Sequence, residues 1–215
     1  MKYFGGELSA VHKDLSGIIR KKGKFEEARE LFYKLHSQLH SKEVYGVDET
    51  EFDRLMHGID QHNCGTALWE LWHISRIEDI TAGILLGGGS QIFSAEIAEK
   101  IGSPVSDTGN AMTDDEVNAF AANVSFDELL SYRNAVGRRS REIVSSLTES
   151  DMKRHFTEDA REKLFISGGL TDNPDSAWLA DYWLSKDCAG IILMPLTRHQ
   201  ILHLNQCGKY FSKLK

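Results

Sequence analysis

Apolar residues near the start of the chain recur at intervals of three and four positions. The clearest run has spacings of 3, 4, 3 and 4 and consists of Phe25, Ala28, Phe32, Leu35 and Leu39. Residues at these spacings share one face of an α-helix, so the pattern predicts an amphipathic helix over about 24–42. A shorter helix is predicted over about 49–57, where apolar side chains again fall on one face.

The next predicted helix, over about 63–86, is apolar on two sides. One side includes Trp69, and the other includes Trp72. A helix that faced water on one side would be polar there, so this pattern indicates a central, well-buried helix. The glycine run at 87–89 is expected to end it.

Two stretches begin with a capping-box pattern, in which Ser or Thr is followed three positions later by Glu. They start at Thr113 and Ser125 and predict helices over about 113–122 and 126–148. Another helix is predicted over about 175–189. A last one is predicted over about 195–208, with Pro195 in its first turn, where a missing N–H costs little.

The segment 149–176 is expected to be irregular because it contains Gly-Gly and Asn-Pro breakers. Alternating strand patterns are nearly absent. The sequence therefore predicts an all-α fold, a four-helix bundle with additional short helices and long connections. At 215 residues the chain is expected to form a single domain over 1–215.

Composition and charge narrow the possible partners. The chain has 25 Lys and Arg against 32 Asp and Glu, a net charge of −7, which disfavours nucleic acid and anionic membranes. No apolar run approaches the roughly 20 residues of a membrane span, and the start lacks a signal-peptide pattern. Three cysteines without a CxxC spacing do not suggest disulfides, so a cytoplasmic location is expected.

The most informative of the nine histidines are those placed on predicted apolar helix faces. His199 and His203 are four positions apart and project from one face of the last predicted helix. His73 lies in the middle of the buried helix. Three imidazoles could hold a divalent metal with a coordination position left open, as in catalytic sites. The alternative is that His73 is a hydrogen-bonded core residue.

His36 and His40 have the same spacing but make a poorer ligand set. On the helical period, His36 lies at the edge of the apolar stripe and His40 further round, toward solvent. His36 is nevertheless kept as a candidate pocket residue. Trp69, one turn before His73, is expected to wall the pocket or to belong to the core.

Arg76 follows His73 by three positions and could face the pocket mouth, although a surface pair with Glu or Asp is the favoured interpretation. Glu78 and Asp79 are expected to point away from His73 and to cap or pair with another helix instead of binding metal. Cys207 shares a face with His203 and is interpreted as a small core residue.

Three segments together resemble the DinB-like (DinB/YfiT) superfamily. They are 71–79 (LWHISRIED), 194–206 (MPLTRHQILHLNQ) with its His-x-x-x-His-x-x-Gln pattern, and the connecting loop 107–113 (DTGNAMT). The resemblance covers about residues 25–210. It implies a four-helix bundle, commonly dimeric, that holds a divalent metal through His73, His199 and His203, with Gln206 near the pocket. Known members include thiol-dependent transferases and an isomerase.

These observations lead to two hypotheses. The first is a metal-dependent enzyme, a hydrolase or thiol-dependent transferase, with zinc or nickel as the ion that the ligand type favours. Its partners would be a small-molecule substrate, a thiol cofactor in the transferase case, and a second copy of the chain. The alternative is a non-catalytic dimeric helical bundle, metal-binding or metal-free, that acts through a protein partner.

Overall fold

The computed structural model describes residues 5–41, 59–60 and 65–213, and their regular secondary structure is almost entirely helical. The α-helices are α1 (Gly5–Ile18), α2 (Phe25–Leu39), α4 (Ala67–Ile80), α5 (Ala95–Ile101), α6 (Asp114–Asn123), α7 (Phe126–Ser146), α8 (Glu158–Ile166), α9 (Pro174–Leu184), α10 (Cys188–Leu193) and α11 (His199–Lys213). Two π-helical segments, η2 (Thr81–Leu86) and η4 (Met194–Arg198), and one 3-10 helix, η3 (Glu149–Lys153), complete the helical part.

Two short strands form a minor antiparallel pair beside these helices. They are β1 (Ile59–Asp60) and β2 (Gly65–Thr66), with Ile59 opposite Thr66. Since each strand has only two residues and every other element is helical, the prediction of an all-α fold is confirmed for the described residues. Within the described residues, no helix combines the length and the apolar character needed to cross a membrane.

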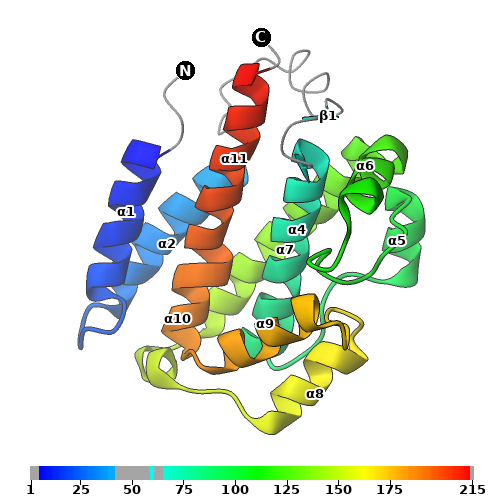
Figure 1. Ribbon diagram of the computed structural model, residues 1–215. Helices are drawn as coiled ribbons and strands as arrows, with labels where there is room; N and C mark the ends of the chain where they lie inside the picture. Colours follow the sequence, from blue (N-terminus) through cyan, green and yellow to red (C-terminus); the bar gives the residue numbers. More distant parts are fainter. Residues whose placement is uncertain (1–4, 42–58, 61–64, 214–215) are drawn as a thin grey trace.

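Helix α4 runs through the middle of the molecule (Figure 1) and packs against α7 and α11. Every residue of α4 except Trp69 is buried, so the prediction of a central helix is confirmed. The helix begins at Ala67, capped by the Thr66 hydroxyl, which accepts a hydrogen bond from the Trp69 amide at 3.0 Å. It continues as the π-helical η2, which ends at Gly87 as expected.

The apolar stripe of α2 is buried along its whole length, from Phe25 to Leu39. The predicted capping box is present at α6, where Thr113 and Glu116 bond reciprocally, and the Ser125 hydroxyl caps α7. The helices predicted over 113–122 and 126–148 are thus confirmed. The short helix predicted over 49–57 lies outside the described residues.

The expectation of an irregular segment over 149–176 is wrong, since η3 and α8 occupy much of it. Leu164 is the buried residue of α8, so there was too little apolar periodicity to predict this helix. Helices α1 and α5 were not predicted either. The helix predicted over 175–189 is interrupted after α9, because Asp187 caps a new helix, α10, by accepting from the Gly190 amide at 2.7 Å.

The last predicted helix is confirmed in outline, with a different start. Pro195 lies in η4, and α11 proper begins at His199. Around the α4–α7–α11 centre, α1 and α2 pack on each other, α5 packs on α7, and α8 contacts α9 across the lower end in Figure 1.

A buried polar group, here called the Glu78 cluster, joins four helices. It consists of Glu78 (α4), His36 (α2), His40 (directly after α2), Arg133 (α7) and Gln200 (α11). The Glu78 carboxylate lies 2.7 Å from His36 Nε2 and 3.0 Å from His40 Nε2, and it accepts from Gln200 Nε2 at 2.6 Å. The Gln200 carbonyl accepts in turn from Arg133 at 2.8 Å.

The partners of this cluster determine the proton positions. Arg141 lies 3.2 Å from His36 Nδ1, and because a guanidinium can only donate, His36 carries its proton on Nε2, toward Glu78. Burial alone would raise the pKa of Glu78, but its interactions with His40 and His36 hold that pKa well below its usual value. Burial, with Arg133 nearby, lowers the pKa of His40 to about 3. The cluster thus contains a charged carboxylate and neutral imidazoles.

The neutral state of His40 predicts a specific loss of stability in acid. Folded His40 stays neutral down to about pH 3, whereas the unfolded chain binds the proton near pH 6.5. The contribution of neutral His40 to the free energy of unfolding is therefore complete above pH 6.5. It is lost as the pH falls toward 3, by roughly 1 kcal/mol per pH unit. With chelator present, urea unfolding of His40→Gln should show a shallower decline over this range than the wild type.

The groups that face His40 are His36, Glu78 and Arg133, and all three remain in that variant. His155→Gln, which changes an exposed histidine, is the matched control and should keep the wild-type pH dependence. Equal slopes in the wild type and His40→Gln would contradict the assignment.

Candidate metal centre

His73, His199 and His203 come together between the central helix and the last one. His73 projects from the middle of α4, while His199 and His203 occupy successive turns at the start of α11. The ring centroids lie 5.0 Å (73 to 199), 4.7 Å (73 to 203) and 4.3 Å (199 to 203) apart. One ring nitrogen from each lies within 4.8 Å of the others, so the group could hold a metal ion.

Hydrogen bonds on the far side of two rings fix which nitrogen faces the centre. His73 Nδ1 lies 2.8 Å from the carbonyl oxygen of Thr108, which can only accept, so Nδ1 carries the proton. His203 Nδ1 donates to the carboxylate of Glu70, a buried residue on α4. In the neutral form of each ring, Nε2 therefore carries the lone pair. Metal-ligating histidines are held in this way in known sites.

The third ring, His199, is less constrained. Its Nε2 lies 3.2 Å from His73 Nε2, and its buried Nδ1 has no hydrogen-bond partner among the described residues. Its proton can therefore move to Nδ1 when Nε2 binds a metal. This donor set fits a divalent ion that accepts imidazole nitrogen.

Burial keeps the imidazoles in the form that binds metal. Desolvation, with a smaller effect of His203, lowers the pKa of His73 to about 3, against the opposing effect of the Thr108 hydrogen bond. Desolvation, His203 and His73 together lower the pKa of His199 well below its usual value. Both rings are therefore neutral at pH 7.

A cavity of about 450 Å³ adjoins the three histidines. The indole of Trp69 forms part of its wall and stacks on His73 with 4.9 Å between ring centroids. This agrees with the expectation that Trp69 walls the pocket. The remaining lining residues are Ile77, Asn110, Trp178, Leu179, Tyr182, Trp183, Met194 and Pro195.

The loop over 107–113 holds the Thr108 carbonyl in place against this wall. Gly109 has a φ of +74°, and a Cβ there would lie 2.9 Å from Trp69 Nε1, so both conformation and space require glycine. The Thr108 hydroxyl donates to Asn110 Oδ1 at 2.9 Å, which sets the orientation of the Asn110 amide.

Arg76 lies in neither of the two places considered from the sequence, the pocket mouth or the surface. It is fully buried and does not line the cavity. Its guanidinium bonds to Asp79 at 3.2 Å and to the Tyr132 hydroxyl at 2.8 Å, so the expected acidic partner is correct but the expected exposure is wrong. Asp79 also accepts from the Phe93 amide at 2.9 Å, which anchors the loop after η2. Arg76 is thus structural.

Gln206 and His36 also lie outside the cavity lining. Gln206 is half-buried, and its carbonyl accepts from Lys209 at 3.3 Å on the outer side of α11. His36 is fully buried in the Glu78 cluster, and His40 joins it there instead of facing solvent. Cys207 is buried, as expected of a core residue, and burial raises the pKa of its thiol well above its usual value.

A second group, His36, His40 and Glu78, could also hold a metal ion by the spacing of its donor atoms. Its protons are arranged differently. Arg141 holds the proton of His36 on Nε2, the atom that would have to bind the metal. The proton positions therefore favour His73, His199 and His203 as the candidate metal centre.

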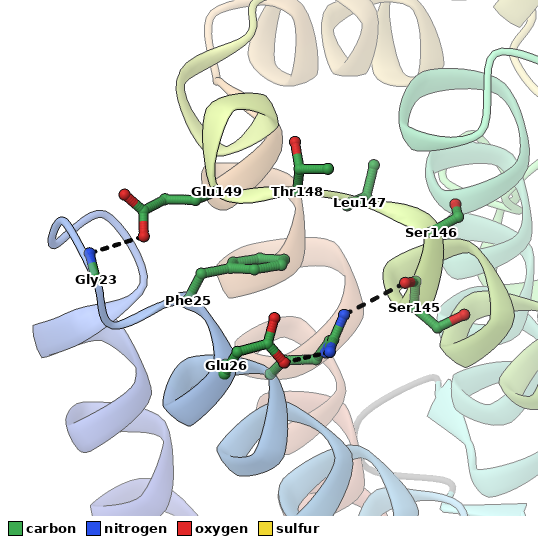
Figure 2. Close-up of a pocket in the computed structure, with 9 residues that line it drawn as sticks. Gly23, Phe25, Glu26, Ser145, Ser146, Leu147, Thr148 and Glu149 are labelled. Atoms are coloured by element: carbon green, nitrogen blue, oxygen red, sulfur yellow. Dashed lines mark hydrogen bonds and ion pairs between the residues drawn. The ribbon is translucent and has the colours of Figure 1, made fainter.

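Another cavity has fewer side chains that could bind a metal or take part in a reaction. It has a volume of about 470 Å³ and lies between the start of α2 and the end of α7 (Figure 2). There, Glu26 pairs with the Arg29 guanidinium, which also bonds to the Ser145 carbonyl, and Glu149 accepts from the Gly23 amide at 2.7 Å. Both carboxylates are engaged, and no histidine or cysteine lines the cavity.

Several residues that shape the site were not predicted from the sequence. Glu70 precedes His73 by three positions, so it shares a helix face with it, and that spacing was a usable signal. The aromatic wall from α9 and the Thr108 carbonyl gave no such signal.

Comparison with the known protein families and with curated proteins finds no match for this chain.

The role of Glu70 as the partner of His203 predicts a measurable effect on metal affinity. Glu70→Gln keeps the side-chain shape but weakens the acceptor that orients the ring. Zinc affinity, measured by competition with a chelating dye, should fall by about 10–100-fold. Glu99→Gln, which alters an exposed carboxylate on α5, should bind zinc like the wild type. Equal zinc affinity in Glu70→Gln and Glu99→Gln would show that Glu70 does not support metal binding.

Proposed function

We propose that this protein is a metal-dependent enzyme whose His73, His199 and His203 hold a divalent ion, zinc or nickel, beside a substrate cavity. The observation that carries the proposal is the pair of Nε2 lone pairs, on His73 and His203, that Thr108 and Glu70 direct toward one centre. The resemblance of 71–79, 107–113 and 194–206 to the DinB-like superfamily supports the same ligands and a four-helix bundle.

A divalent ion bound there would polarise an oxygen or lower the pKa of a bound water or thiol, which suits hydrolysis or thiol transfer. The chain's own residues supply orientation and shielding. Thr108 and Glu70 hold the rings, and Trp69 covers His73 and limits water at its ring. The side-chain oxygen Oδ1 of Asn110 accepts a hydrogen bond from the Thr108 hydroxyl. The side-chain NH₂ of Asn110 is therefore the group that can donate a hydrogen bond to a substrate oxygen.

The non-catalytic alternative makes no use of the cavity beside the histidines. In a protein that acts only through partner binding, a metal would be structural, with its coordination closed by protein atoms. Three imidazole ligands beside about 450 Å³ of space favour an open position and hence the enzyme. The buried thiols of Cys188 and Cys207 are compatible with the proposed cytoplasmic location.

The ligand set is tested by metal content. After zinc loading and dialysis of the tag-free chain, the wild type should bind zinc in equimolar amount. His73→Gln, His199→Gln and His203→Gln should each lose most of it, since two imidazoles alone hold zinc weakly. His155→Gln is the matched control on an exposed histidine and should retain it.

The open position is tested in the same protein loaded with cobalt(II). Addition of azide should change the visible spectrum of the wild type. Full zinc occupancy in the His199→Gln/His203→Gln double variant would refute the ligand set. A cobalt spectrum that does not change when azide is added would favour the non-catalytic alternative.

A homodimer belongs to the proposal through the resemblance. The apolar row of Phe25, Phe32 and Leu39 and the run 191–194 (IILM) also suggest a dimer face in the sequence. In the structure the row, Ile191 and Ile192 are buried within the chain, and Leu193 and Met194 are half-buried, so little apolar surface is left for a partner to cover. Sedimentation at micromolar concentration should give about twice the 24.2 kDa chain mass. A 24.2 kDa species throughout would remove the dimer and leave the metal centre untouched.

A further inference from the structure

The wall of the cavity beside the three histidines is aromatic and apolar. No Asp, Glu, Lys or Arg lies among its described lining residues, and its polar members besides the histidines are Asn110 and Tyr182. A charged group is costly to bury unless it is paired. A ligand whose body carried such a group would find no partner on this wall.

Two basic side chains, Arg20 and Lys186, line an adjoining cavity of about 360 Å³. Tyr182 and Met194 line both cavities and so form the partition. On the far side Arg20 pairs with Asp187, and the Lys186 ammonium lies 3.7 Å from the centroid of the Tyr182 ring. These cations are engaged outside the histidine cavity.

Helix α9 contributes a fixed aromatic surface. Trp178 is 49% exposed while also lining the cavity, so it lies at the entrance. Its Nε1 donates to the Asp175 carbonyl at 3.1 Å, which fixes the indole, and the Tyr182 ring lies 5.7 Å away. A cavity of about 150 Å³ admits benzene, so a volume threefold larger has room for one or two rings.

We infer that the ligand of this cavity is a compact aromatic molecule of one or two rings whose only ionisable group is the oxygen or sulfur donor that binds the metal. The inference rests on the proposed metal centre. The Asn110 NH₂ suits a carbonyl oxygen beside that donor. Charged peptide thiols do not match this wall, so a thiol substrate would itself be aromatic or apolar.

Hydroxamates test this directly because they share one metal-binding head that includes a carbonyl. Calorimetry of the zinc-loaded chain should show benzohydroxamate binding at least about tenfold more tightly than acetohydroxamate, owing to burial of the phenyl ring. Glutathione should bind more weakly than benzohydroxamate. Zinc content is measured separately in every sample.

Trp178 variants locate the effect. Trp178→Ala should lose most of the preference for the phenyl group while keeping the affinity for acetohydroxamate, and Trp178→Phe should retain much of the preference. Ile166→Ala is the matched control, because Ile166 is an exposed apolar residue of α8 outside the cavity lining. It should behave like the wild type.

The outcomes separate the two proposals. With equimolar zinc present, equal affinity for the two hydroxamates, or tighter binding of glutathione, would overturn the inference and leave the metal centre standing. Failure to bind zinc would overturn both. The hydroxamate comparison on the unaltered chain decides the matter even where a Trp178 variant does not fold.

Discussion

The fold depends on one buried carboxylate. Glu78 has no contact with water, so its charge requires donors from the protein, and these come from α2 and α11 while Arg133 of α7 approaches through Gln200. An ionised group without such partners would cost several kcal/mol. Sliding or rotating any of these helices would break at least one hydrogen bond, so the cluster fixes their mutual register.

That register also assembles the metal centre. Glu78 and His73 lie on the same helix five positions apart, and their partners on α11, Gln200 and His199, are adjacent in sequence. Two polar contacts about 7.5 Å apart along α4 therefore connect the same pair of helices. Contacts of this kind leave little freedom for α11 to shift, and so they hold the three imidazoles at one point without any metal.

The two pairs of histidines spaced four apart show how context decides chemistry. His36 and His40 face a carboxylate, with Arg141 behind His36, and so they donate hydrogen bonds to Glu78. By contrast, Nδ1 of His203 donates a hydrogen bond to Glu70, and its Nε2 faces the other two imidazoles. The same spacing on two helices thus gives a structural anchor in one case and candidate ligands in the other.

The sequence by itself determined the all-α class, the central position of α4, the capped starts of α6 and α7 and the placing of His73, His199 and His203 on apolar helix faces, because each depends on helical periodicity or on local hydrogen bonds. It did not reveal α8, whose single buried leucine leaves no periodic signal, nor the buried state of Arg76, His36 and His40. Only the tertiary structure decided these, together with the tautomers and the aromatic wall from α9. The physical reason is that burial, proton position and cavity shape depend on partners far apart in the chain, such as Thr108 for His73 and Arg141 for His36.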